Sequence, residues 1–207
     1  MLNRTIIPAV IAIVYCFSWV TAVGQSIDPL IFPKDNFTVE IRIVKTSSGE
    51  KKITYHSYMH ILYVAKPVDK DFQSLNVSVP VKINDVTIDA TNAPIFFSIG
   101  IGGYMSVRNA GNAVPRAGSG GSGATRSLSS RDDLALAAGF VVVTPGCRGR
   151  DNKADDGTFY GKAPAAIVDL KAAVRYLRHN KGILPGNVDQ IISVGCSAGG
   201  AISALLG

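Results

Sequence analysis

The stretch that decides the fold is Ile191-Ile192-Ser193-Val194-Gly195-Cys196-Ser197-Ala198-Gly199-Gly200. It begins with a short apolar block of the kind that forms a buried strand. Glycines follow, and the residues after them, Ala201 to Leu206, favour a helix. The sequence therefore predicts a strand, a sharp turn and a helix in direct succession, with Ser197 in the turn.

The turn carries the pattern G-x-S-x-G, in which Gly195 and Gly199 flank Ser197. A serine in a strained strand-to-helix turn projects its hydroxyl from the sheet edge, so the residues two before and two after it must be nearly free of side chains. We therefore predict that Ser197 is a catalytic nucleophile, that Cys196 completes the elbow, and that the Ala198 N–H points toward an oxyanion. The alternative is a serine in an ordinary tight glycine turn.

A second glycine-rich loop, Ile99-Gly100-Ile101-Gly102-Gly103-Tyr104, follows the apolar block Ile95-Phe96-Phe97. Gly102 and Gly103 would let the backbone approach a substrate closely, which predicts a second oxyanion donor; the alternative is an ordinary turn. The loop lacks the Lys-Ser/Thr of a phosphate-binding loop, and the chain shows no metal-ligand constellation. We expect neither cofactor nor metal.

The rest of the chain predicts an α/β fold. Helical patterns over 132–138 and 164–180 alternate with apolar blocks at 140–143 and 191–194, which is typical of parallel strands buried on both faces. Upstream, alternating apolar and polar residues predict an antiparallel meander over 37–44, 53–63 and 75–81. We expect these antiparallel strands to lead into a parallel sheet.

The elbow, the Gly-Gly-Tyr loop, Gly146-Cys147-Arg148-Gly149-Arg150 and the block from Gly161 to Gly207 resemble secreted bacterial-type tannases and feruloyl esterases of the α/β-hydrolase fold. The resemblance covers about residues 93–207. It implies a serine esterase in which Ser197 accepts the acyl group, Ala198 and the Gly102-Gly103 loop form the oxyanion hole, and the small-molecule substrate is a carboxylic ester of a phenolic acid. The alternatives are a serine peptidase of the same fold and a non-catalytic binding module.

The resemblance also predicts what should follow Ser197, because in this fold an acid and then a histidine come after the nucleophile. None follows here, and the histidines His56, His60 and His179 all precede it. We interpret the chain as the N-terminal portion of a hydrolase, truncated after the nucleophile elbow and expected to be inactive by itself.

Residues 1–24 resemble a secretory signal peptide, with a short basic start, an apolar run and small residues before Gln25. A retained membrane anchor is the alternative. With the leader cleaved, we expect a secreted protein without stable membrane association. Residues 25–207 then form one incomplete domain, with a mobile Gly/Ser-rich loop at about 105–131.

In a secreted protein, cysteines can form disulfides and Asn-x-Ser/Thr triplets can be glycosylated. The expected strand order puts Cys147 and Cys196 two strand spacings apart, which is too far for a disulfide unless a loop folds back. Resemblance to fungal tannases instead implies that Cys196 pairs with a cysteine beside the missing histidine. Asn36 and Asn76 begin N-glycosylation triplets.

Composition narrows the function classes. The chain has 207 residues, of which 47% are hydrophobic and 17% charged, as expected for one globular domain. The net charge of +6 comes from 21 basic and 15 acidic residues, and loss of Arg4 with the leader makes it 20 − 15 = +5. No basic run is present, so we expect no nucleic-acid partner. The oligomeric state stays open.

Overall fold

The computed structural model describes residues 28–109 and 128–207. The expected signal peptide and most of the expected Gly/Ser-rich loop lie outside the described residues. In the described part, no helix is long and apolar enough to cross a membrane.

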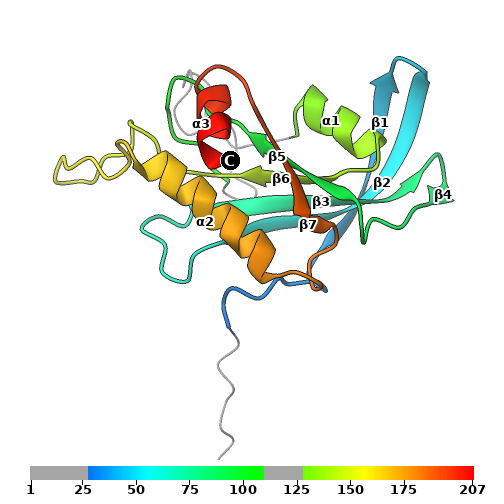
Figure 1. Cartoon of the computed structure of the whole chain (residues 1–207), viewed down its shortest axis with the longest axis horizontal. Coiled ribbons are helices and arrows are strands. Elements are labelled where there is room, and N and C mark those ends of the chain that lie inside the picture. The colour runs from blue at the N-terminus through cyan, green and yellow to red at the C-terminus, as the bar shows by residue number, and fades with distance from the viewer. Residues whose placement is uncertain (1–27, 110–127) are drawn as a thin grey trace, which may run out of the picture.

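The described chain alternates strands with three helices in the order shown in Figure 1. The strands are β1 (Thr38–Thr46), β2 (Gly49–Leu62), β3 (Ser74–Ile83), β4 (Val86–Thr87), β5 (Pro94–Ile99), β6 (Val141–Pro145) and β7 (Asn187–Gly195). The helices are α1 (Ser130–Ala137), α2 (Ala165–His179) and α3 (Ala198–Leu206).

These strands form one mixed sheet in the order β1-β2-β3-β6-β5-β7, with β4 paired to β3. β1, β2, β3 and β6 pair antiparallel along the order, whereas β5 pairs parallel with both β6 and β7. The predicted antiparallel meander leading into a parallel sheet is therefore confirmed. So is the expected position of β5 between β6 and β7.

Helices cover both faces of the sheet, and alternate residues of each strand face different cores. Val141 and Val143 join the larger core, together with Leu170 and Leu177 of α2 and Ile202 of α3. Val142, between them, packs with α1 in a second cluster. Two buried layers are what the continuous apolar run of β6 predicts.

The prediction of burial on both faces is wrong for β7. Ile192 is 46% exposed, and it lines a shallow apolar groove of about 500 Å³ together with Phe96, Leu134 and Phe140. The physical reason is position: β7 is the outermost strand of the described sheet, and α3 packs on it from the side of the larger core.

Both ends of the expected loop at 105–131 lie in the described part of the chain. Its beginning is ordered, because Val107 forms a bridge to Cys147 and Asn109 is buried. At its end, Ser129 caps α1: its hydroxyl and Asp132 form a capping box. Residues 110–127 lie outside the described part.

The two glycosylation triplets differ. Asn36 is exposed just before β1. Asn76 is 6% exposed within β3, where its side chain accepts from the His60 N–H at 2.8 Å and donates to Asn109 Oδ1 at 3.2 Å. Glycosylation at Asn36 and at Asn76 stays a prediction, and at Asn76 the burial of the side chain in the described fold disfavours it. In this fold the Asn76 amide is a structural hydrogen-bonding group.

A buried ion pair joins the loop after β6 to α2. The Arg148 guanidinium donates to both carboxylate oxygens of Asp169, at 2.8 and 2.9 Å, and the Arg148 N–H donates to the same carboxylate. Their side chains are 13% and 1% exposed. The hydrogen bond to Asp169 raises the pKa of Arg148, and Gln73 adds a further donor to the carboxylate.

Replacing Arg148 by alanine should destabilise the fold strongly, because it leaves a buried carboxylate without its cation. Breaking such a pair costs about 3–5 kcal/mol, and the donors that remain on Asp169 favour the lower figure. The matched control, Lys181→Ala, removes the exposed Lys181–Asp189 pair and should cost less than about 1 kcal/mol. Urea denaturation measures both. Equal losses would contradict this account.

A buried phenol near the same loop makes the fold sensitive to alkali. The Tyr63 hydroxyl donates to Gly146 O at 3.0 Å. Burial, reinforced by the Asp169 carboxylate, raises the pKa of Tyr63 well above its usual 10. The folded state therefore keeps a proton that the unfolded chain loses.

Stability from the neutral Tyr63 is fully present below about pH 10 and is lost as the pH rises through the higher folded pKa. The free energy of unfolding should fall above that pH, and it should fall less steeply in Tyr63→Phe. Urea denaturation at a series of pH values tests this, and an identical slope in the variant would overturn it.

Candidate active site

Three loops meet at the carboxyl ends of the parallel strands β6, β5 and β7 (Figure 1). The loop after β5 carries Gly102 and Gly103, the loop after β6 carries residues 146–161, and β7 runs into Ser197. Because Ile99 pairs with Gly195 in the parallel ladder, the first and third loops start side by side. Ligands bind at this edge of α/β sheets.

Ser197 sits in the strained conformation that its motif predicts. Its backbone angles are φ 53° and ψ −124°, directly before the first residue of α3. A positive φ is uncommon for a residue with a side chain and persists only where surrounding structure enforces it. Ser197 is exposed, and its side chain does not cap the helix.

Packing of the two motif glycines enforces this turn. A Cβ at Gly195 would overlap the carbonyl oxygen of Gly199, and a Cβ at Gly199 would lie 3.1 Å from the carbonyl oxygens of Ile99 and Ile101. The turn folds back so tightly that position 195 has no room for a side chain. Gly195 and Gly199 are therefore closely packed backbone positions of the turn.

The turn is hydrogen-bonded to the predicted oxyanion loop. The Gly199 N–H donates to Ile101 O at 3.1 Å, which fixes the residue before Gly102 against the start of α3. Gly102 and Gly103 are exposed, and Gly103 has φ 57°. Among the described residues the Ala198 N–H has no backbone acceptor. The structure therefore brings together Ser197, Ala198 and the Gly102-Gly103 loop.

A carboxylate supports this loop from the side, and sequence reasoning missed it. Asp151 accepts from the Ser106 N–H at 2.6 Å and from the Ser106 hydroxyl at 2.7 Å. Nearby, the Arg150 N–H donates to Tyr104 O at 3.0 Å. A Cβ at Gly149 would overlap the Ser106 backbone. Nothing in the sequence around Asp151 indicates this contact.

Asn109 anchors the other end of the same loop. The Asn109 side-chain amide donates to Thr144 O at 2.6 Å and to Ser74 O at 3.2 Å. The backbone carbonyl oxygen of Asn109 lies 2.9 Å from His60 Nδ1. Thr144 lies in β6, which neighbours β5, whereas Ser74 begins β3 and His60 is near the end of β2. The loop from Gly102 to Asn109 is thus fixed at both ends.

The histidines occupy structural positions. His60 belongs to the Asn109 network, His56 stacks on Phe37 with ring centroids 3.8 Å apart, and His179 lies 3.4 Å from Asp28. Within residues 28–109 and 128–207, no histidine or carboxylate is hydrogen-bonded to the Ser197 side chain. The same residues hold no cluster that could bind a metal.

The two described cysteines lie in different surroundings. Cys147 is buried at the bridge to Val107, whereas Cys196 is exposed beside Ser197. No disulfide joins them. Pairing of Cys196 with another cysteine stays a prediction.

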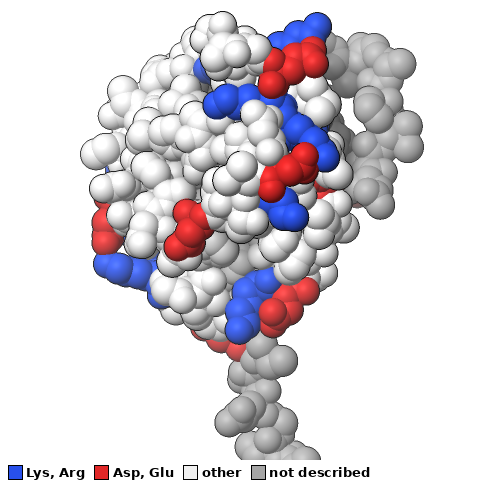
Figure 2. Space-filling view, turned by 90° about the vertical axis from the view of Figure 1, so that its right-hand side faces the viewer, with Lys and Arg blue, Asp and Glu red and all other residues white. Residues whose placement is uncertain are grey.

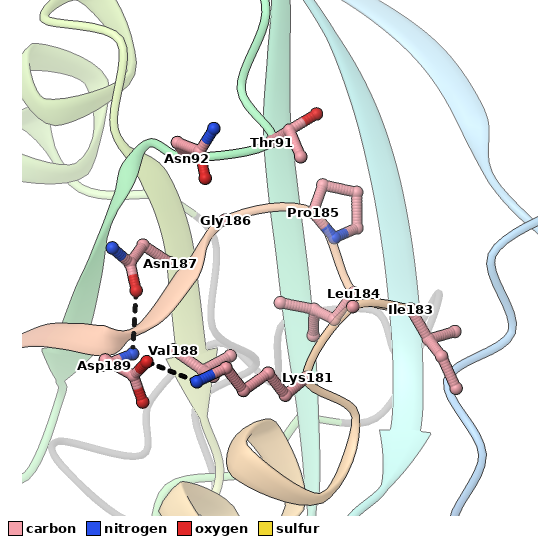
Figure 3. Close-up of a pocket in the computed structure, with 11 residues that line it drawn as sticks. Thr91, Asn92, Lys181, Ile183, Leu184, Pro185, Gly186, Asn187, Val188 and Asp189 are labelled. Atoms are coloured by element: carbon pink, nitrogen blue, oxygen red, sulfur yellow. Dashed lines mark hydrogen bonds and ion pairs between the residues drawn. The ribbon is translucent and has the colours of Figure 1, made fainter.

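A separate pocket of about 490 Å³ lies at the opposite edge of the sheet. Figure 3 shows its lining, from Thr91 and Asn92 before β5 to the segment 181–189 that enters β7, with Lys181 paired to Asp189. Because it sits at the amino ends of β5 and β7, it lies a full strand length from Ser197 and takes no part in the site.

Comparison with known proteins gives matches to ester hydrolases. The BD-FAE family model, a feruloyl esterase-type α/β-hydrolase domain, matches residues 127–207. Among solved structures, a tannase from Fusobacterium nucleatum is 43% identical with a TM-score of 0.68, over 86% of this chain and 35% of its own. No curated protein matches.

Two further solved structures agree. A tannase from Lactobacillus plantarum is 37% identical with a TM-score of 0.67, and the match covers 85% of this chain and 36% of that one. A tannin acyl hydrolase in complex with ethyl gallate is 36% identical with a TM-score of 0.66, over 85% and 37%. The chain thus spans little more than a third of the tannases it matches, and the expected resemblance and α/β-hydrolase fold are confirmed.

Replacing Asp151 by alanine should loosen the loop beside Ser197, because Ser106 loses both hydrogen bonds. Amide exchange, followed by mass spectrometry, should become at least about tenfold faster in peptides covering 102–108. Asp156→Ala is the matched control, since Asp156 accepts from Thr158 in the same long loop but does not contact Ser106. Unchanged exchange in Asp151→Ala would show that the loop does not depend on this carboxylate.

Proposed function

We propose that this chain supplies the nucleophile and the oxyanion donors of a secreted serine hydrolase that cleaves carboxylic esters through an acyl-enzyme. The observation that carries the proposal is the Ser197 turn, with its positive φ and its hydrogen bond from Gly199 to Ile101. An exposed serine directly before α3, with α3 bonded to the residue before Gly102, supports the proposal. Similarity to tannases and to a feruloyl esterase-type domain supports ester hydrolysis over other acyl transfers.

In the proposed reaction the Ser197 Oγ attacks the ester carbonyl carbon and transfers its proton to a general base. The carbonyl oxygen becomes an oxyanion that accepts hydrogen bonds from the Ala198 N–H and from Gly102 or Gly103. One such donor contributes roughly 3 kcal/mol to transition-state stabilisation. Collapse breaks the bond to the alcohol, which leaves with the proton, and water then hydrolyses the acyl-serine.

The general base and its carboxylate partner are assigned to the whole protein rather than to the described residues. A serine without an adjacent base is a poor nucleophile at neutral pH. His56, His60 and His179 are held in other contacts, so none of them is proposed for this role. The chain by itself is therefore expected to be inactive.

The proposed substrates are esters of phenolic acids. This rests on the relatives, since one tannin acyl hydrolase is in complex with ethyl gallate and another with 3,4-dihydroxybenzoate. Secretion is proposed from the leader-like residues 1–24.

A non-catalytic hydrolase-like module is the second candidate. It is favoured by one observation: within the described residues, no base is hydrogen-bonded to the Ser197 side chain. The two candidates make opposite predictions for the whole protein.

The test is ester hydrolysis by the whole protein expressed from its own gene, with ethyl gallate as substrate. Ser197→Ala should lower turnover by roughly 10³-fold or more, because the acyl-accepting oxygen is lost. Ser203→Ala is the matched control. Ser203 lies in α3, its hydroxyl is hydrogen-bonded to the Ser193 hydroxyl, and it has no role in the proposed reaction.

A fluorophosphonate probe adds a second measurement, because it reacts only with an activated serine. It should label Ser197 in the whole protein and leave the 207-residue chain unlabelled. Turnover that survives Ser197→Ala would exclude the nucleophile assignment. A whole protein that neither hydrolyses ethyl gallate nor takes the label would support the non-catalytic module.

A further inference from the structure

Strand β1 forms the edge of the described sheet opposite β7 and carries an exposed apolar stripe. Val39, Ile41 and Ile43 are 60%, 63% and 58% exposed. β1 pairs with β2 on one side only, and no other described strand pairs with its outer side. An exposed edge strand with large apolar side chains is a template for pairing with another chain.

The other face of β1 is occupied within the same chain. Val44 is buried, Arg42 forms an ion pair with Asp133 of α1 at 2.8 Å, and Glu40 accepts from the Tyr55 hydroxyl at 2.7 Å. Helix α1 also contacts β3, β5 and β6, so its body lies over the interior of the sheet. Among residues 28–109 and 128–207, the fold therefore uses the even-numbered residues of β1 and leaves its odd-numbered stripe exposed and its outer edge without a paired strand.

The sequence of β1, Thr-Val-Glu-Ile-Arg-Ile-Val from Thr38 to Val44, is complementary to itself when read in the opposite direction. If two copies pair antiparallel about a two-fold axis at Ile41, each Glu40 lies opposite an Arg42 of the other copy. Val39 then lies opposite Ile43, and Ile41 opposite its own counterpart. Directly opposite residues in such a pair point to the same face and interact.

We propose that β1 is a dimerisation edge that pairs antiparallel with β1 of a second copy of this chain, centred on Ile41. Opposite charges meet at Glu40 and Arg42, and β-branched apolar pairs cover the other face. Both features arise in the same pairing register. If one strand slipped by one residue relative to the other, the apolar stripes of the two copies would lie on opposite faces of the joined sheet.

The surroundings of the edge agree with this arrangement. Figure 2 shows the side of the molecule that carries the β1–β2 hairpin. Acidic and basic side chains lie there in small mixed groups, with uncharged surface between the groups. No field of a single sign covers this side, so two copies can approach. Within the strand itself, the only charges besides Glu40 and Arg42 belong to Lys45 near the hairpin turn.

The first test uses the two-fold axis. Size-exclusion chromatography with light scattering of the whole protein should give twice the mass of one copy at micromolar concentration. Ile41→Lys should give the monomer mass, because two ammonium groups then face each other, and Ile41→Glu should do the same with carboxylates. Mixing these two variants should restore a dimer. Val86→Lys, at an equally exposed residue of β4, is the control and should leave the dimer intact.

The second test measures the register by cross-linking in a Cys196→Ser background, which removes the exposed native thiol. Opposite Cα atoms in an antiparallel pair are about 4.5–5.5 Å apart, within the range of a disulfide. Ile41→Cys should therefore oxidise to a covalent dimer. Val39→Cys should not, because two copies of position 39 lie about 13 Å apart in this register.

These measurements use the whole protein expressed from its own gene, and a whole protein that stays monomeric at 100 µM overturns the proposal. A dimer that persists in Ile41→Lys, or that cross-links through Val39→Cys rather than Ile41→Cys, also overturns it. These readouts need no catalytic activity, so they stand or fall independently of the proposed ester hydrolysis.

Discussion

The candidate site depends on one steric constraint, the absence of a side chain at Gly195. Because the backbone of Gly199 occupies the space where a Cβ would lie, the chain can turn back on itself directly after β7. That turn holds Ser197 at φ 53° and starts α3 at the next residue. It also brings the Gly199 N–H within 3.1 Å of Ile101 O, which ties the elbow to the loop after β5.

Around this constraint, polar groups hold the neighbouring loops. Asp151 fixes Ser106, Asn109 links the strands β3 and β6, and the Arg148–Asp169 pair joins the loop after β6 to α2. A buried charge pair contributes little net stability by itself, but it is costly to break. Such groups suit a region where backbone N–H groups must keep fixed directions.

The sequence allowed the strands, the helices and the elbow to be predicted because these depend on local patterns. The continuous apolar run of β6 and the glycines at 195 and 199 are visible without tertiary information. The contacts of Asp151 with Ser106 and of Arg148 with Asp169 could not be predicted, since they join residues 45 and 21 positions apart and at least one partner of each contact lies in a loop without periodicity. The burial of Asn76 escaped prediction for a related reason. A short triplet says nothing about the strand that contains it.

The central claim is that the Ser197 elbow and the Gly102-Gly103 loop form one oxyanion hole. A crystal structure of the whole protein with a phosphonate bonded to Ser197 Oγ tests it most directly. The account predicts that one phosphonyl oxygen lies about 2.7–3.1 Å from the Ala198 nitrogen and from the nitrogen of Gly102 or Gly103. A phosphonyl oxygen that points into solvent, with Gly102 and Gly103 turned away from it, would contradict the account.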